Sequence, residues 1–258
     1  MISPIEALGA RAMGVADTFG GLSLLSLRTL RAGLEHRLPW AELLRALDVI
    51  GVQSTSIVAL TALFTGLVLA LQTGIGLQRF GSSEYTGYIV SLAIVRELGP
   101  VLTALIVGGR VAGGIAAELG SMQVTEQVDA IRAMGGDPIR KLVVPRVIAC
   151  VITLPMLALL ADVLGILGST LIASTQFSIP AYYFVETVRQ SVLFSDVVSG
   201  VTKTVFFGFA IAVIACYEGL STAGGTVGVG RATTRAVVQS SVAVLVLNFF
   251  LTKLFLLL

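Results

Sequence analysis

The stretch of sequence that decides the fold runs from Tyr88 to Ala117 and reads YIVSLAIVRELGPVLTALIVGGRVAGGIAA. It is long and apolar enough to cross a bilayer, which takes about 20 residues. Two adjacent charged residues, Arg96 and Glu97, nevertheless lie inside it. A charge in hydrocarbon is costly unless it is paired or faces a water-filled cavity. The stretch therefore indicates a substrate path, a subunit seam or a gate more than a simple membrane anchor.

The composition of the chain is that of an integral membrane protein. Of its 258 residues 55% are hydrophobic and only 12% are charged, whereas soluble domains carry about 25% charged residues. The apolar residues form several long runs, which excludes a soluble domain with one anchor. No Lys/Arg-rich tract is present, so no nucleic-acid partner is expected. With a single histidine, His36, and no acidic or cysteine cluster beside it, the chain is expected to bind no metal.

The apolar runs predict an all-α polytopic membrane protein with five transmembrane helices. Residues 1–258 are interpreted as one domain, in which an N-terminal segment (1–48) precedes the transmembrane region (49–258). Within the N-terminal segment, Val15–Leu34 is expected to form an amphipathic helix at the membrane interface. The five spans are expected at Val49–Leu77, Tyr88–Ala117, Leu142–Ala173, Val197–Tyr217 and Val237–Leu258.

The distribution of basic residues predicts the orientation of the chain in the membrane. Lys and Arg gather before the first span, between the second and third, and between the fourth and fifth, whereas the opposite side holds only Arg79 and Arg189. Basic loops stay on the cytoplasmic side. The N-terminus is therefore expected in the cytoplasm and the C-terminus outside.

Three connecting segments carry further expectations. Pro180–Leu193 begins with a proline suited to a helix start and should form a short helix on the outer surface. Met122–Met134 has apolar residues at helical spacing and charged residues on another face, which predicts an amphipathic cytoplasmic helix. Such a helix is suited to docking a soluble partner or to lying on lipid headgroups. Gly225–Ala232 is interpreted as a flexible connection.

Depth in the bilayer predicts which polar residues meet. At 1.5 Å per helical residue, Glu97 and Lys203 lie at a similar depth from the outer edge, and Asn248 lies at a comparable level. Because Arg96 is the sequence neighbour of Glu97, their side chains should point in different directions. The group is either an ion pair that fixes packing or the wall of a lipid-accessible cavity. Asp162, in the third span, is either a proton-relay acid or an acid hydrogen-bonded to a nearby Ser or Thr.

Small residues recur in the second span, where Gly109, Gly113 and Ala117 follow one another at intervals of four. Such spacing lets two helices approach closely. The contact is either a dimer seam or packing within one subunit.

Taken together, several of these motifs resemble the signature of the MlaE (YrbE) permease family. The resemblance covers nearly the whole chain in order. The segments that carry it are Val95-Arg96-Glu97-Leu98-Gly99-Pro100-Val101, Gly109-Arg110, Ala117-Glu118-Leu119-Gly120-Ser121-Met122, Thr125-Glu126-Gln127, Asp137-Pro138 and Arg231-Ala232-Thr233-Thr234-Arg235-Ala236-Val237-Val238.

The resemblance implies the transmembrane subunit of an ABC transporter in the bacterial inner membrane. It implies a homodimer, a cytoplasmic ATPase that binds ATP and Mg, a periplasmic MCE-domain hexamer and often a STAS-domain protein. The cargo would be phospholipid moved between the inner and outer membranes, and this chain would be no enzyme and hold no cofactor of its own. The residues that the resemblance places around a lipid cavity are Arg96, Glu97, Lys203, Asn248, Leu67, Leu71 and Val101.

The same resemblance places a coupling helix between Glu118 and Met134. The residues expected to dock on the ATPase are Glu118, Met122, Val124, Glu126, Val128, Asp129 and Arg132. Two alternatives stay open. One is a proton-coupled secondary transporter in which Asp162 and Glu97 relay protons. The other is a membrane scaffold that only recruits the ATPase and MCE partners.

Overall fold

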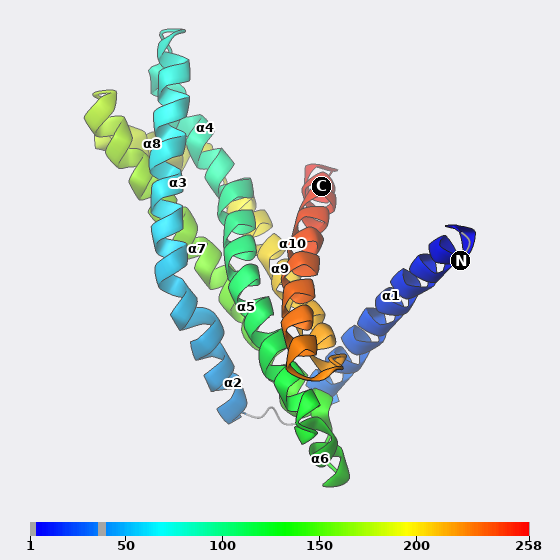
Figure 1. The fold of residues 1–258 in the computed structure, drawn as a ribbon. Coiled ribbons are helices and arrows are strands. Elements are labelled where there is room, and N and C mark those ends of the chain that lie inside the picture. Colours follow the sequence, from blue (N-terminus) through cyan, green and yellow to red (C-terminus); the bar gives the residue numbers. More distant parts are fainter. Residues whose placement is uncertain (1–3, 36–39, 258) are drawn as a thin grey trace.

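The computed structural model describes residues 4–35 and 40–257, and within these ranges all regular structure is helical (Figure 1). Five helical segments are long and apolar enough to cross a membrane, which confirms the predicted all-α fold and its five spans. Each overlaps one predicted span. They are Trp40–Gln78, Ser83–Val124, Ile139–Gln176, Phe194–Leu220 and Gly225–Phe255.

The first three segments are not uniform α-helices, because each contains one π-helical turn. Such a turn inserts an extra residue, bulges the backbone and occurs frequently at functional sites. The first segment comprises α2 (Trp40–Leu47), η1 (Asp48–Val52) and α3 (Gln53–Gln78). The second comprises η2 (Ser83–Tyr85), α4 (Thr86–Ala93), η3 (Ile94–Leu98) and α5 (Gly99–Val124). The third comprises η4 (Ile139–Val143) and α7 (Val144–Gln176).

The fourth and fifth segments are the single helices α9 (Phe194–Leu220) and α10 (Gly225–Leu257). The fifth corrects two predictions. Its helix begins twelve residues before the predicted Val237, and the Gly225–Ala232 stretch, expected to be flexible, forms its first turns. Hydropathy missed these turns because they are rich in glycine and carry Arg231 and Arg235. Ala232 and Ala236, on the inner face of this part of α10, are completely buried.

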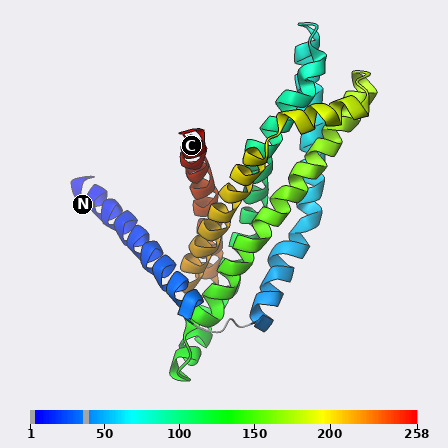
Figure 2. The same cartoon turned by 180° about the vertical axis from the view of Figure 1, so that it is seen from behind.

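Packing places α5, α7 and α9 at the centre of the bundle. α3 packs mainly against α7, whereas α10 packs against α5 and α9. Figures 1 and 2 show α3 and α10 at opposite sides of the bundle. More than half of the most apolar stretch of α7 is buried, but only about a tenth of that of α10. The outer helices therefore keep broad apolar faces for lipid or for another protein.

The contact between α3 and α7 is unusually close because it is built on glycine. A Cβ atom placed on Gly66 would lie 2.0 Å from the carbonyl oxygen of Gly165. The Ser169 hydroxyl of α7 donates a hydrogen bond to the Gly66 carbonyl at 3.1 Å. Small residues of this kind allow helix backbones to touch in a membrane, where side-chain packing drives association. The close contact fixes α3 against the central helices.

The remaining helices lie at the ends and side of the bundle. α1 (Pro4–Glu35) includes the predicted interfacial segment and diverges from the spanning helices (Figures 1 and 2). α8 (Ala181–Ser191) confirms the short helix predicted between the third and fourth spans. At the opposite end of the bundle, α6 (Gln127–Ala133) follows α5. These two ends are called the α8 end and the α6 end below.

Candidate functional site

The predicted charged doublet lies on a π-helical turn, η3, at the place where α5 begins. Pro100 is the second residue of α5 and has no N–H group, so it cannot bond the carbonyl of Arg96 four residues earlier in the way an α-helix requires. Lys203 of α9 donates to that carbonyl from its Nζ atom at 3.0 Å. The irregular backbone of the second span is thus completed by a side chain from the fourth span.

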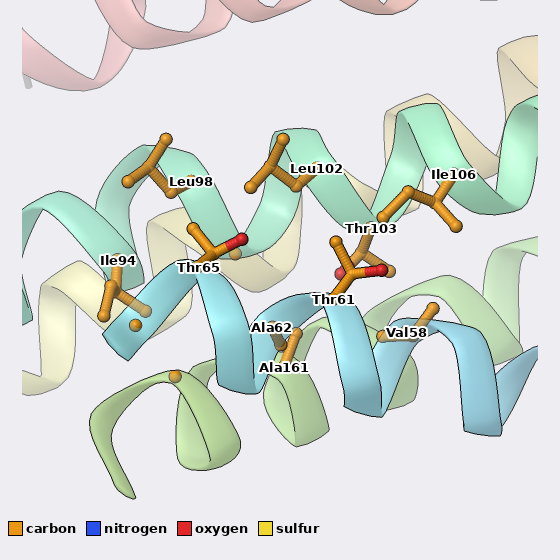
Figure 3. Close-up of a pocket in the computed structure, with 13 residues that line it drawn as sticks. Val58, Thr61, Ala62, Thr65, Ile94, Leu98, Leu102, Thr103, Ile106 and Ala161 are labelled. Atoms are coloured by element: carbon orange, nitrogen blue, oxygen red, sulfur yellow. The ribbon is translucent and has the colours of Figure 1, made fainter. Parts of the chain in front are cut away.

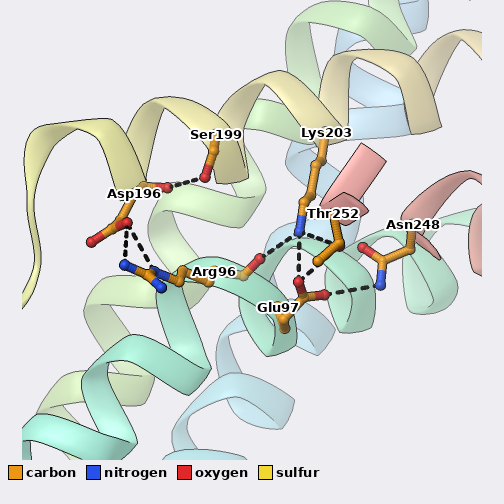
Figure 4. Close-up of polar contacts among 7 residues, drawn as sticks. All are labelled: Arg96, Glu97, Asp196, Ser199, Lys203, Asn248 and Thr252. Atoms are coloured by element: carbon orange, nitrogen blue, oxygen red, sulfur yellow. Dashed lines mark hydrogen bonds and ion pairs between the residues drawn. The ribbon is translucent and has the colours of Figure 1, made fainter. Parts of the chain in front are cut away.

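Lys203 forms the centre of a polar cluster between η3, α9 and α10 (Figure 4). Its ammonium has three N–H donors, and a second one reaches Glu97 Oε1 at 2.7 Å. The third reaches the Thr252 hydroxyl of α10 at 2.8 Å. Lys203 is only 2% exposed. The predicted meeting of Glu97 and Lys203 is confirmed, and all three donors of the buried ammonium are satisfied.

Glu97 is held from the α10 side as well. Asn248 donates from Nδ2 to Glu97 Oε2 at 2.9 Å, and the Thr252 hydroxyl lies 2.9 Å from Oε1. Both carboxylate oxygens therefore have partners, which lowers the cost of keeping a charge at this depth. Asn248 thus gives the second Glu97 oxygen a neutral partner.

Arg96 points away from this cluster, in agreement with the predicted divergence of the doublet. Its guanidinium contacts Asp196 Oδ1 at 2.8 Å through both Nε and Nη2. The other Asp196 oxygen accepts the backbone N–H of Leu193 at 3.0 Å and so caps the start of α9. The side chain of Arg96 remains 45% exposed. It is therefore a fixed cation that an external anion can approach.

Two members of the site, Asp196 and Thr252, are not among the residues predicted from the sequence. Thr252 follows Asn248 by four positions, so helical spacing placed both on one face of α10 and offered a usable signal. Asp196 lies in the first turn of α9, where an acidic residue is typical of helix capping. Nothing in the sequence pattern connects it to Arg96, from which it is 100 positions distant.

An apolar groove lies beside the charged doublet, between α3 and the second span. Its volume is about 610 Å³. Leu98 joins the groove to the site, because it follows Glu97 on the same π-helical turn. A narrow pocket continues between α3, α5 and α7, and Figure 3 shows Thr61 and Thr65 facing Leu98 and Leu102 across it. The groove is lined by Leu60, Thr61, Phe64, Thr65, Val68, Leu69, Gln72 and Leu98.

The three apolar residues predicted to line a lipid cavity do not line this groove. Leu67 and Leu71 lie on α3 but are partly buried, and the backbone of Leu67 approaches Gly168 of α7. Val101 packs against the hydrophobic core. Their part in a cavity stays a prediction, whereas Phe64 of α3 and Leu98, next in sequence to Glu97, line the groove.

The segment Met122–Met134 is not one continuous helix, which corrects the prediction. α5 ends at Val124 and α6 begins at Gln127. Glu126 between them adopts a left-handed conformation with φ of 60°, which few residues other than glycine adopt. The break turns α6 out of the line of α5 at the α6 end (Figure 1).

The residues predicted to dock on a partner divide into a buried and an exposed group. Val128 is completely buried and attaches α6 to the bundle. Asp129 and Arg132 form an exposed ion pair of 2.7 Å, and Glu126 is exposed beside them. Glu118 lies apart on α5, where it pairs with Arg146 at 2.8 Å. Met122 and Val124, partly buried, close the end of α5.

Two further acids have different surroundings. The Asp162 carboxylate lies against Gly99, and no described residue forms a hydrogen bond to its buried Oδ1. Of the two alternatives for Asp162, the hydrogen bond from a nearby Ser or Thr is therefore not formed at this oxygen. Glu218, near the α6 end of α9, accepts hydrogen bonds from Arg235 and Gln239 of α10, both at 2.8 Å. Glu218 therefore forms a second polar connection between α9 and α10, in addition to the one between Lys203 and Thr252.

Two of the four glycines between positions 108 and 114 of the second span serve packing within the subunit. A Cβ on Gly108 would contact Ile211 of α9, and one on Gly113 would contact Val237 of α10. Gly109 and Gly114 face open space. The stripe of small residues thus supports intrasubunit packing on one side and leaves the other side free.

Comparison with known proteins shows the family to which the chain belongs. The family model described as Permease MlaE matches residues 43–254. The chain belongs to the MlaE permease family. A probable ABC transporter permease protein of Rickettsia bellii is 40% identical over 255 residues, which are 99% of this chain and 98% of that protein. Five apolar helices and membership of the MlaE family together make it a multi-pass membrane protein.

Two other relatives carry more specific names. The intermembrane phospholipid transport system permease protein MlaE of Haemophilus influenzae is 35% identical over 255 residues, 98% of each chain. The chloroplastic protein TRIGALACTOSYLDIACYLGLYCEROL 1 of Arabidopsis thaliana is 37% identical over 222 residues, 86% of this chain and 63% of that protein. The names of the MlaE relatives are those of permease and transport subunits.

Proposed function

We propose that this chain is the permease subunit of an ABC transporter that moves phospholipid between the inner and outer membranes. The observation that carries the proposal is a π-helical turn in the second span whose Leu98 lines an apolar groove and whose Arg96 keeps a partly exposed charge. Leu98 lines the groove, and Arg96 stands two residues before it. A phospholipid combines acyl chains with an anionic phosphate, so each part of the molecule has a matching surface here.

Arg96 is suited to hold the lipid phosphate. A guanidinium binds phosphate through two parallel hydrogen bonds, as it does a carboxylate. Arg96 uses Nε and Nη2 on Asp196 of α9, so a phosphate that reaches Arg96 would compete with Asp196 for these two donors. The partial exposure of Arg96 makes this exchange sterically accessible.

The Lys203 cluster connects the helix that lines the groove to the two helices packed beside it. It joins the second span to α9 and α10 through Glu97, Asn248 and Thr252. α5 runs unbroken from this cluster to α6 over roughly 39 Å. When a partner displaces α6, α5 therefore transmits the displacement to η3, which contains Arg96 and Leu98. We assign α6 and its exposed Glu126, Asp129 and Arg132 to the docking surface for the ATPase.

The partners in this proposal follow the family's assembly. Two copies of the chain meet across exposed apolar helix faces and enclose the lipid cavity. The ATPase binds ATP and Mg, and this chain supplies gating and no cofactor. A periplasmic MCE-domain hexamer sits at the α8 end, and a STAS-domain protein joins the ATPase where the operon encodes one.

The proposed orientation places the α6 end in the cytoplasm of the inner-membrane system, with the N-terminus cytoplasmic and the C-terminus periplasmic. Basic residues concentrate at the α6 end, as the rule for cytoplasmic loops requires. Those belonging to the described segments near this end are Arg45, Arg110, Arg132, Arg140, Lys141, Arg146, Arg231 and Arg235.

Co-expression of the chain with its operon neighbours, followed by native mass spectrometry, tests the assembly. The proposal predicts two copies of the chain with two ATPases and retained phospholipid. A complex without lipid would favour the scaffold alternative. A chain without ATPase whose transport follows a proton gradient would favour the secondary transporter, although the full hydrogen bonding of Glu97 suits a relay acid poorly.

A further inference from the structure

A second cavity lies at the α6 end, far from the charged doublet. It has a volume of about 560 Å³ and is enclosed by α2, α5 and the η4–α7 junction. Arg110, in its wall, follows Arg96 by fourteen residues, which is roughly 21 Å along the second span. Much of the lining is apolar, with residues such as Val49, Ile50 and Ile115. The charged residues in its lining are Glu42, Arg45, Arg110, Glu118, Lys141 and Arg146.

The cations in this cavity exceed the acids that could neutralise them. Glu118 is already paired with Arg146 at 2.8 Å. The side chains of Arg45 and Lys141 are exposed, and neither side chain forms a hydrogen bond or ion pair with any described residue. Glu42 is the one other carboxylate in the lining. The cavity therefore keeps a net positive charge after its internal ion pair is formed.

Arg110 is fixed in position while its charge stays uncompensated. Its Nη1 donates to the Val49 carbonyl at 3.2 Å and to the Ser54 hydroxyl at 2.7 Å, and its Nη2 donates to Gln53 Oε1 at 2.9 Å. These three acceptors are neutral, and no described carboxylate lies within ion-pair distance of Arg110. The Nε–H and one Nη2–H remain free to bind an anion.

We propose that this cavity binds the phosphate of an anionic phospholipid from the leaflet at the α6 end. Arg110, Arg45 and Lys141 would surround the phosphate, and the apolar wall would take the first part of the acyl chains. Basic pockets between membrane helices bind anionic headgroups in this way. The apolar wall and the position within a spanning helix favour a lipid over an acidic protein segment. This site does not depend on the proposed transport function, because it lies outside the groove and uses other residues.

The single tryptophan of the chain provides a local probe. Trp40 begins α2, is 66% exposed and precedes Arg45 by five residues. The full-length chain would be reconstituted in phosphatidylcholine vesicles that contain increasing fractions of phosphatidylglycerol with brominated acyl chains. Parallel vesicles would contain brominated phosphatidylcholine instead. Bromine quenches tryptophan only at short range, so the proposal predicts stronger quenching by the anionic lipid at equal mole fraction.

Two variants and one matched control decide the result. The double variant R45Q/K141Q removes the two unpaired cations and should raise the fraction of brominated phosphatidylglycerol needed for half-maximal quenching by about tenfold or more. R231Q removes an exposed cation of α10 that does not line the cavity, and should leave the fraction unchanged. G114L places an apolar side chain in the cavity lining, where a Cβ on Gly114 meets no atom within 4 Å, and should reduce the preference without changing any charge.

Several outcomes would overturn the proposal. Equal quenching by both lipids, or equal loss in R231Q and R45Q/K141Q, would show that no specific site exists. Relief of quenching by inorganic phosphate at low concentration would assign the site to a soluble phosphate in place of a lipid. Loss of ATPase co-purification in R45Q/K141Q with unchanged lipid preference would assign these cations to protein docking.

Discussion

The Nζ atom of Lys203 lies 2.7 Å from Oε1 of Glu97, although 106 positions separate the two residues in the sequence. The pair joins the second span to the fourth, and Asn248 and Thr252 extend it to the fifth. It is therefore a structural connection between three helices as well as a neighbour of the groove. Substitutions can separate its contribution to stability from its contribution to function.

Lys203→Met should destabilise the protein by about 3 kcal/mol, because it leaves Glu97 charged without its main partner. Lys203→Met combined with Glu97→Gln should recover much of that loss, since the unpaired charge is then gone. Denaturation of the purified chain in mixed micelles measures both. Equal destabilisation by the single and double variants would show that packing, and not charge pairing, dominates at this site.

Asn248→Asp should also destabilise the chain, because it places a second carboxylate beside Glu97 Oε2, which now accepts from Asn248 at 2.9 Å. Like charges at this distance repel strongly in a low-dielectric site. Glu97→Gln in the same chain should relieve the repulsion and raise the melting temperature again. A melting temperature of Asn248→Asp equal to that of the wild type would mean that the cluster accommodates a second acid.

Gly66→Ala tests the close contact between α3 and α7. A Cβ there would lie 2.0 Å from the Gly165 carbonyl, so we expect a loss of about 1–3 kcal/mol from overpacking. Gly76→Ala is the matched control on the same helix, because its Cβ would meet no atom within 4 Å. Thermal melts of both variants give the comparison. A similar melting temperature for the two would contradict the packing described for α3.

Charge reversal on α6 tests its assignment as the docking surface. Glu126→Lys and Asp129→Lys should each reduce lipid-stimulated ATPase activity of the purified complex severalfold while the fold stays intact, because both side chains are exposed. Glu84→Lys changes an exposed acid at the α8 end and should leave the activity unchanged. If transport survives both reversals, α6 does not transmit movement from the ATPase.

Part of this architecture could be predicted because helix geometry converts sequence position into depth. Glu97 and Lys203 were expected at one level from their distances to the span ends alone, and their partner Asn248 followed by the same argument. The divergence of Arg96 from Glu97 follows from helical geometry in the same way. Apolar run length was sufficient to locate all five spans, although not their ends.

Other features depend on contacts that no local pattern records. The early turns of α10 are glycine-rich and polar, yet Glu218 holds Arg235 and Gln239 against α9. The left-handed Glu126 ends the continuity of the predicted coupling helix, and few residues of its type adopt that conformation. The pairing of Arg96 with Asp196 required the tertiary fold. The tertiary fold also determines that Phe64 and Leu98 line the groove, whereas Leu67 and Val101 do not.

The central claim is that a phospholipid occupies the groove beside the charged doublet, and site-specific photocrosslinking tests it most directly. A photoreactive phenylalanine analogue would replace Phe64, which lines the groove and is 56% exposed. The matched control would replace Phe206, which is 48% exposed on α9 and does not line the groove. The complex would be purified before illumination, so that only retained lipid is captured. We predict a phospholipid adduct at position 64 and little at position 206. Equal labelling at both positions, or none at position 64, would contradict the account.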